Sequence, residues 1–300
     1  MLNPVAAPPR LVSVSTIWLQ PKTLPEALAM LAADPALTPF AGGTDLYPAQ
    51  AARFAWGEAL PEAILDLGAL PEFWGIAADA TQWRIGAGAT WAQLRDAALP
   101  AEFDVLRAAS CQVGGAQIQN RGTIGGNLCN ASPAADGVPP LLALDAAVEL
   151  ASLRGTRTLP LGKFLLGNRQ TERAPDELLT AVLVPHRAGD LRSGFEKLGA
   201  RHYLVISIVM VAAMVRMEAG RIAEAAIAVG ACSAVAQRLP ALEAALRGSR
   251  PGEVAVTPGQ LDHLAPIDDA RATGAYRREA ALVLVRRLLA RLALPEALVA

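Results

Sequence analysis

The chain has 300 residues, a formal net charge of −1 and 53% hydrophobic residues, enough for a sizeable core in one or two domains. The near-neutral charge, with arginines scattered along the chain, argues against a nucleic-acid-binding surface. The N-terminus lacks the basic segment and unbroken apolar run of a secretory signal. The longest apolar run, Tyr203 to Val215, is too short to span a bilayer. We therefore expect a cytoplasmic protein with no membrane span.

The first sixty residues predict a small unit of strands and helices. A strand is expected at Leu11 to Leu19, and a helix at Thr23 to Ala33 begins with a capping box. Leu37 to Phe40 predicts a short strand that leads directly into Gly42-Gly43, and Asp45 then opens a second helix. A strand, a glycine loop and a helix N-terminus in this order direct backbone N–H groups toward an anion.

The next region alternates short strands and helices around a polar segment. The expected strands are Ala63 to Leu67, Phe73 to Ala78, Gln82 to Gly86, Ala147 to Leu153, Thr156 to Leu159 and Leu178 to Val184. The expected helices are Thr90 to Ala98, Phe103 to Cys111 and Asp136 to Leu144. Within Gln117 to Leu142 the centre is small and polar, and we expect a second glycine loop there. Gly125 and Gly126 have no Cβ, so a ligand can approach the backbone closely.

A polar linker at Pro185 to Ser193 is the best candidate for a domain boundary. Beyond it, the pattern predicts strands at Gly194 to Leu198, Leu204 to Met217 and Arg221 to Gly230, the last two joined by a tight turn. The remainder predicts helices at Leu239 to Leu246, Pro258 to Leu264 and Gly274 to Leu292.

Each glycine loop alone is most often an ordinary turn. Two such loops folded together would instead make a cradle for a ligand that carries phosphate groups. The three cysteines, Cys111, Cys129 and Cys232, are too few to hold an iron–sulfur cluster, which takes four ligands in suitable spacing. The three histidines are too scattered for a convincing metal site.

The segments PFAGGTDL (Pro39 to Leu46) and RGTIGGNLCNASPAAD (Arg121 to Asp136) resemble the two FAD-binding motifs of the molybdenum hydroxylase flavoprotein subunit. That family includes the medium subunits of bacterial carbon monoxide dehydrogenases and the flavin domain of xanthine dehydrogenase. The resemblance covers nearly the whole chain. It implies an α+β fold: a two-part PCMH-type FAD-binding domain at 1–187 (subdomains about 1–60 and 61–187), then a C-terminal flavoprotein domain at 193–300 with a three-stranded antiparallel sheet and helices.

The resemblance also implies a function. The chain would be an oxidoreductase subunit that binds FAD and passes electrons from the iron–sulfur clusters of a small subunit to an external acceptor, which could be NAD, oxygen, a quinone or a redox protein. Substrate would be oxidised at the molybdenum cofactor of a separate large subunit, and no residue of this chain is expected to be catalytic. An alternative is a self-contained FAD-dependent oxidase of the vanillyl-alcohol oxidase type, which would need its own substrate pocket.

By the same resemblance, the cofactor-binding residues would be Ala41, Gly42, Gly43, Thr44, Asp45, Leu46, Val113, Thr123, Gly125, Gly126, Asn127, Ser132, Asp136, Leu179, Lys197 and Ile206. Several have plainer interpretations. Val113 could be ordinary core, and Ser132 a loop turn. Asp136 could be the N-cap of the following helix, and Lys197 could be a solvated lysine on a strand. An isoleucine at position 206, where many carbon monoxide dehydrogenase relatives have tyrosine, puts a stacking role for the Ile206 side chain in doubt.

Overall fold

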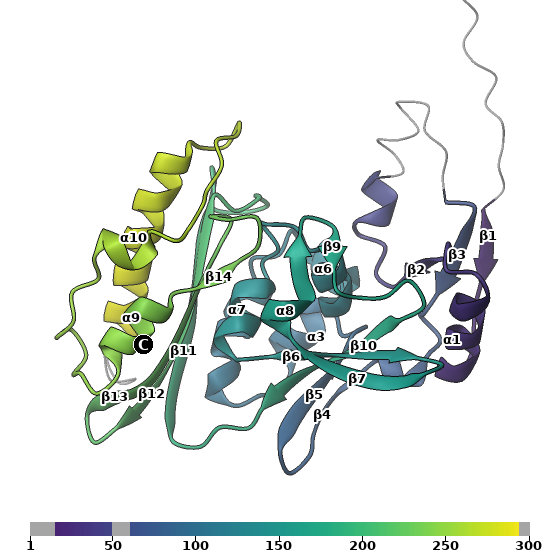
Figure 1. The fold of residues 1–300 in the computed structure, drawn as a ribbon, viewed down its shortest axis with the longest axis horizontal. Coiled ribbons are helices and arrows are strands. Elements are labelled where there is room, and N and C mark those ends of the chain that lie inside the picture. The colour runs from purple at the N-terminus through teal and green to yellow at the C-terminus, as the bar shows by residue number, and fades with distance from the viewer. Residues whose placement is uncertain (1–15, 50–60, 294–300) are drawn as a thin grey trace, which may run out of the picture.

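The computed structural model describes residues 16–49 and 61–293 of the chain. Of the four β-sheets in the described residues, the three larger ones follow one another along the long axis of the molecule, with the N-terminal sheet at one end and the C-terminal sheet at the other (Figure 1). Mixed strands and helices with an antiparallel C-terminal sheet confirm the expected α+β class. The first part of the strand expected at Leu11 to Leu19, and the subdomain boundary expected near residue 60, lie outside the described residues.

The N-terminal unit is a parallel sheet of three short strands in the order β1 (Ile17–Leu19), β3 (Ala63–Asp66), β2 (Thr38–Phe40). Helix α1 (Leu24–Ala33) crosses between β1 and β2. It begins at the predicted N-cap, Thr23, whose side chain accepts a hydrogen bond from the backbone N–H of Glu26. Strand β2 is followed by an irregular segment at residues 41–45 and a helical turn, which is the order of elements that the sequence predicts.

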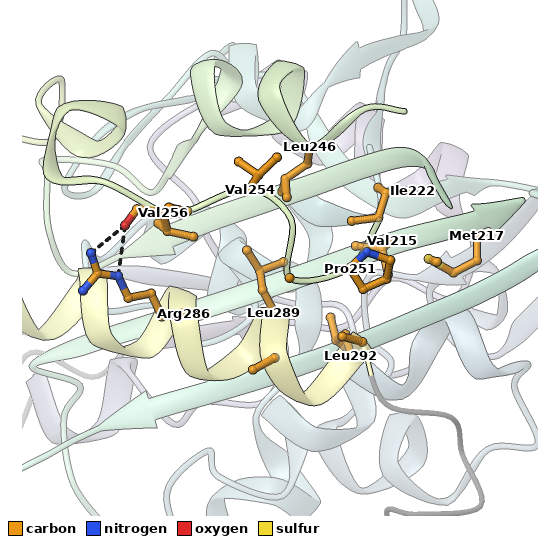
Figure 2. A pocket seen from close by; sticks show the side chains of 14 residues that line it. Val215, Met217, Ile222, Leu246, Pro251, Val254, Val256, Arg286, Leu289 and Leu292 are labelled. Atoms are coloured by element: carbon orange, nitrogen blue, oxygen red, sulfur yellow. Dashed lines mark hydrogen bonds between the residues drawn. The ribbon is translucent and has the colours of Figure 1, made fainter. Parts of the chain in front are cut away.

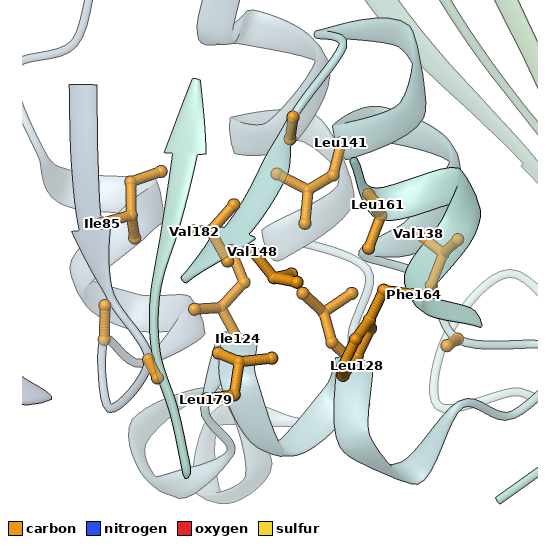
Figure 3. Packing of buried hydrophobic residues seen from close by; sticks show 14 of the residues in the cluster. Ile85, Ile124, Leu128, Val138, Leu141, Val148, Leu161, Phe164, Leu179 and Val182 are labelled. Carbon is orange, nitrogen blue, oxygen red and sulfur yellow. The ribbon is translucent and has the colours of Figure 1, made fainter. Parts of the chain in front are cut away.

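The middle unit is an antiparallel sheet of five strands. Its strand order is β4 (Ile76–Ala78), β5 (Gln82–Gly86), β10 (Leu178–Pro185), β6 (Ala147–Ser152), β7 (Gly155–Pro160). The helical elements of this unit are η1 (Pro71–Phe73), α3 (Trp91–Asp96), η2 (Ala101–Phe103), α4 (Asp104–Ser110), α5 (Ala116–Arg121), α6 (Ile124–Asn130), α7 (Val138–Ala143) and α8 (Leu161–Phe164). Ile124 and Leu128 of α6 are fully buried in the same cluster as Val148 and Val182 of the sheet (Figure 3). This packing fixes α6 against the sheet.

Two features of the middle unit differ from the sequence-based expectation. The second glycine segment is helical, because Thr123 caps α6 through the N–H of Gly126 and because Gly125 fits closely against Ala87. The close packing outweighs the poor helix propensity of two glycines. The strand expected from Phe73 begins only at Ile76, since Pro71 starts a turn of 3₁₀ helix.

The C-terminal unit is an antiparallel sheet in the order β11 (Asp190–Leu198), β12 (Val209–Glu218), β13 (Arg221–Gly230), β14 (Gln237–Arg238). The three expected strands are present, and the two-residue β14 adds a fourth at the edge. Helices α9 (Pro240–Leu246), η3 (Pro258–Leu261) and α10 (Gly274–Ala293) follow. Alternate residues of β12 belong to different cores: Met210 and Ala212 join the cluster of the middle unit, whereas Val209 and Val211 join the cluster that contains α10. The sheet is therefore buried on both faces.

Three boundaries in this unit were predicted wrongly. Strand β12 begins at Val209 rather than at Leu204, which has a φ of 52°, outside the range of a strand. Strand β11 begins at Asp190, so the linker is shorter than Pro185 to Ser193. Pro258 to Leu264 forms only the 3₁₀ turn η3. In each case the error lies at an end of an element, where hydrophobic pattern is a weak guide.

The middle and C-terminal units are joined through Ser193. Its Oγ accepts a hydrogen bond from the backbone N–H of Val105 at 2.9 Å and donates to the carbonyl of Glu102 at 2.9 Å. Since the N–H of Val105 lies in the first turn of α4, Ser193 on β11 acts as a helix cap supplied from another unit.

We predict that Ser193→Ala lowers the free energy of unfolding by about 1 kcal/mol, the usual cost of losing a helix cap. The variant leaves the N–H of Val105 without its partner, while no apolar contact is lost. Urea denaturation of the purified protein measures the effect as a lower midpoint with an unchanged slope. A midpoint equal to that of wild type would show that water replaces the hydroxyl at no cost.

Candidate functional site

The two glycine segments meet at the junction of the N-terminal and middle units. A Cβ on Gly42 would overlap the carbonyl oxygen of Arg121, so the first segment touches the chain just before α6. Gly42 is required here by close approach rather than by backbone conformation, since no positive φ occurs at this residue. The expected pairing of the two segments is present in the structure.

A groove of about 630 Å³ lies along this junction. Its volume is in the range of cofactor sites in proteins. Of the residues expected to bind the cofactor, the groove brings together Ala41, Gly42, Gly43, Thr44, Asp45, Leu46, Val113, Thr123, Gly125, Gly126, Asn127 and Leu179. The lining therefore combines both motifs with apolar side chains from the middle unit.

The backbone N–H groups at the start of α6 already have partners. The N–H of Gly125 donates to the carbonyl of Ala87 at 2.8 Å, and that of Gly126 donates to Thr123 Oγ1 at 3.1 Å. The N–H of Asn127 donates to the carbonyl of Thr123 at 3.0 Å. These three N–H groups are therefore not available to a ligand, whereas the N–H of Thr123 makes no hydrogen bond within the described residues. The segment leaves space for a ligand at Gly126. A Cβ at that position would meet Thr123 Oγ1 and would otherwise project into open space.

The first segment has more free donors. Within the described residues, the backbone N–H groups of Gly42, Gly43, Thr44 and Asp45 make no hydrogen bond. Gly43 has a φ of 74°, a conformation that favours glycine, and the side chains of Phe40 and Tyr47 close around it. Successive unpaired N–H groups in such a turn form an anion-binding concavity.

The lining also holds an unsatisfied acceptor. Asn130 Oδ1 is buried and has no hydrogen-bond partner among the described residues. A buried acceptor without a donor is destabilising by about 1 to 3 kcal/mol. A ligand with hydroxyl or amino groups, such as a nucleotide, would remove that cost. The free N–H groups, the open face at Gly126 and this acceptor together fit the phosphate and sugar parts of FAD.

Four of the expected residues lie outside the lining of the groove: Ser132, Asp136, Lys197 and Ile206. Ser132 Oγ accepts from the N–H of Ala134, which is the loop-turn interpretation. Ile206 is 54% exposed in the connection between β11 and β12. A direct contact of these four with the cofactor stays a prediction.

Asp136 and Lys197 form a buried ion pair between the middle and C-terminal units. Lys197 Nζ lies 2.9 Å from Asp136 Oδ2, and the two side chains are 4% and 12% exposed. Ser207 Oγ donates to Asp136 Oδ1 at 2.8 Å, and Lys197 Nζ also donates to the carbonyl of Gln112. The interpretation of Lys197 as a solvated strand lysine is therefore wrong. Helix α7 has no side-chain N-cap, so the capping role considered for Asp136 is wrong as well.

Burial raises the pKa of Asp136 above its ordinary value, and the charge and hydrogen bonds of Lys197 and Ser207 oppose that rise. The carboxyl therefore depends on its partners to remain ionised. Any change that removes the lysine exposes the full cost of the buried charge.

Sequence analysis missed the hairpin β8 (Leu165–Gly167) and β9 (Gln170–Thr171), which reaches the groove. Its tip places Arg169 in the lining, and Arg173 follows just beyond. Gly167-Asn168 is a turn dipeptide between short strands and was the available signal. Asn130, whose Oδ1 faces no partner within the described residues, was also not predicted as a binding residue.

A second cavity, of about 470 Å³, lies in the C-terminal unit between α10 and strands β12 and β13 (Figure 2). Val215, Ile222 and Leu289 point into it. The guanidinium of Arg286, at its edge, donates to the carbonyl of Val256. Because its lining is apolar, this cavity does not suit a phosphate-bearing cofactor.

The described residues show no cluster of histidine, cysteine and acidic side chains able to hold a metal ion. Cys111 is exposed, Cys129 lies in the lining of the groove, and Cys232 is buried. No helix within residues 16–49 and 61–293 is long and apolar enough to cross a membrane.

Two family models match the chain. Residues 12–187 match the FAD binding domain in molybdopterin dehydrogenase, and residues 195–292 match the CO dehydrogenase flavoprotein C-terminal domain. The boundary between the two matches falls where β11 begins. The first match includes both glycine segments and the whole lining of the groove.

Relatives and solved structures agree with these matches. The chain is 30% identical to the nicotine 6-hydroxylase medium subunit of Paenarthrobacter nicotinovorans over 275 residues, which cover 90% of this chain and 94% of that subunit. It is 36% identical to the nicotinate dehydrogenase FAD-subunit of Eubacterium barkeri over 198 residues, 64% and 66% of the two chains. A carbon monoxide dehydrogenase structure from Hydrogenophaga pseudoflava matches with a TM-score of 0.85 and 29% identity over 93% of this chain and 96% of that one. The chain belongs to the FAD-binding medium subunits of the molybdenum hydroxylases, a family of oxidoreductases.

Proposed function

We propose that this chain is the electron-transfer subunit of a heteromeric molybdenum hydroxylase. It would receive electrons from the iron–sulfur clusters of a small subunit and give them to an external acceptor, while a large subunit oxidises the substrate at its molybdenum cofactor. The observation that carries the proposal is the groove that joins both glycine segments, in a chain that aligns with 94% of a medium subunit. When bound, FAD supplies both one-electron and two-electron chemistry.

The residues of the groove have separate tasks in this proposal. The free N–H groups of Gly42 to Asp45 would bind the pyrophosphate. Gly126 leaves room for the cofactor to approach α6, and Asn130 Oδ1 would accept a hydrogen bond from a hydroxyl or amino group. Leu178 and Leu179 provide an apolar wall that excludes water.

The proposal is tested by flavin reduction. The isolated chain, loaded with FAD, should show no rapid reduction by organic substrates of the family. The same chain should be reduced once it is combined with the proposed small and large subunits. Bleaching of flavin absorbance in a stopped-flow instrument measures both rates. Rapid reduction of the isolated chain would instead identify a self-contained oxidase of the vanillyl-alcohol type.

We predict that FAD is bound non-covalently, in a ratio of about one to one. Cys129 is the cysteine that lines the groove, and burial raises the pKa of its thiol. Since the thiolate is the nucleophile, a raised pKa disfavours a covalent link to the flavin. Acid precipitation should release the yellow colour into the supernatant. Colour that stays with the pellet of wild type, but not with that of Cys129→Ser, would contradict the prediction.

A further inference from the structure

Arg169 crosses the groove to reach the first glycine segment. Its Nη1 lies 3.0 Å from Asp45 Oδ2 and its Nη2 lies 3.2 Å from Asp45 Oδ1, a two-point ion pair between residues 124 positions apart in the chain. Both residues line the groove. The pair holds the guanidinium beside the free N–H groups of Gly42 to Asp45, which are donors available to an anion.

The backbone of Arg169 indicates that this placement has a cost. Arg169 lies at the tip of the β8–β9 hairpin with a φ of 56°, at a turn position where glycine is usual. Its N–H donates to the carbonyl of Asn130, which fixes the tip against α6. Strained positions of this kind concentrate at ligand sites, where the surrounding structure holds them in place.

The charges in the groove also favour a cation at the position of Arg169. A pyrophosphate bound at the first segment would lie close to the carboxylate of Asp45, and the two anions repel. Arg173, the other arginine of the lining, directs its Nη1 to the carbonyls of Ala174, Pro175 and Glu177 at 2.7 to 3.3 Å. Arg169 is paired with a side chain instead, so its guanidinium can turn from Asp45 toward a phosphate.

We propose that Arg169 is a cofactor-binding residue: its guanidinium binds the pyrophosphate of FAD, and Asp45 holds it over the groove until the cofactor arrives. The inference rests on the proposed FAD site. Planar guanidinium groups suit two-point recognition of phosphate oxygens. The role differs from that of a simple clasp between two units, because binding would use the guanidinium itself, whereas a clasp would depend equally on both partners.

The test compares apoprotein variants in FAD titrations followed by flavin fluorescence, at low and high salt. Arg169→Gly removes the cation and relieves the strained φ, so FAD affinity should fall about tenfold or more, the usual loss with a charge-assisted contact. The salt dependence of binding should fall as well, while the melting temperature of the apoprotein stays level or rises. Asp45→Asn keeps the cation and the backbone N–H of residue 45 and removes the carboxylate that repels the phosphates, so FAD affinity should fall much less than in Arg169→Gly.

Arg154→Gly is the matched control, because Arg154 forms a similar pair with Asp176 outside the groove. It should leave FAD affinity unchanged. Wild-type affinity in Arg169→Gly, or an equal loss in Arg169→Gly and Asp45→Asn, would overturn the inference and leave the FAD site standing. If wild type itself binds no FAD, the result contradicts the proposed function and not the role of Arg169 alone.

Discussion

Gly126→Val is expected to weaken FAD binding by about 100-fold, since forcing extra methyl groups into a filled site typically costs up to about 3 kcal/mol. Gly126 lies in the first turn of α6, is exposed, and faces the groove. The new side chain would meet Thr123 Oγ1 at 2.9 Å and otherwise project into the space that the cofactor needs. Valine has a higher helix propensity than glycine, so the helix itself should persist. Flavin content and circular dichroism of the purified variant measure the two effects separately.

Gly162→Val is the matched control for this variant. Gly162 is also an exposed helical glycine, and a Cβ there would have Leu142 Cδ2 at 3.8 Å as its nearest neighbour. It should retain FAD and fold normally. Gly43→Val is a poorer test, because the φ of 74° and the rings of Phe40 and Tyr47 would strain the local fold as well. Normal flavin content in Gly126→Val would remove Gly126 from the binding site.

The elements that sequence predicted well have a strong local cause. Helix α1 begins where predicted because the side chain of Thr23 caps it, although the reciprocal bond of a capping box is absent, since Glu26 accepts from the N–H of Lys22 instead. Strands β6 and β7 form the hairpin expected around Arg154-Gly155. The resemblance of the two glycine motifs to a known family gave the cofactor. The hydrophobic pattern alone does not predict a cofactor, because each loop by itself is most often an ordinary turn.

The errors have tertiary causes. Gly125 lies in a helix because it packs against Ala87 of another segment, a contact that sequence does not display. Which N–H groups remain free for a ligand also depends on such distant partners, so the roles of the two glycine segments were not predictable. Arg169 reaches the groove through an ion pair with Asp45, 124 positions away. The burial of Lys197 likewise follows from the docking of β11 against the middle unit. A position on a strand is equally compatible with a solvent-exposed side chain, so the sequence does not predict this burial.

The second prediction of a large effect concerns the buried Asp136–Lys197 ion pair at this junction. Lys197→Met is expected to lower the free energy of unfolding by about 3 to 5 kcal/mol, because removing one partner of a buried ion pair leaves an uncompensated charge. Methionine keeps most of the volume of lysine, so the loss reports on charge more than on packing. Asp136 would retain Ser207 as a hydrogen-bond donor, which cannot replace the cation. Urea denaturation at neutral pH measures the change.

The pH dependence distinguishes this cause from a packing defect. Burial already raises the pKa of Asp136 in the folded state, and without Lys197 the pKa rises further. A carboxyl with a raised folded-state pKa favours folding at pH below its unfolded value and loses that contribution as the pH increases. The stability difference between wild type and Lys197→Met should therefore be small near pH 4 and should widen toward neutral pH. Adding Asp136→Asn should recover much of the loss at neutral pH, whereas the exposed control Lys163→Met should change little. A stability difference that is the same at every pH, and is not reduced by Asp136→Asn, would show that the lysine stem and not its charge stabilises this junction.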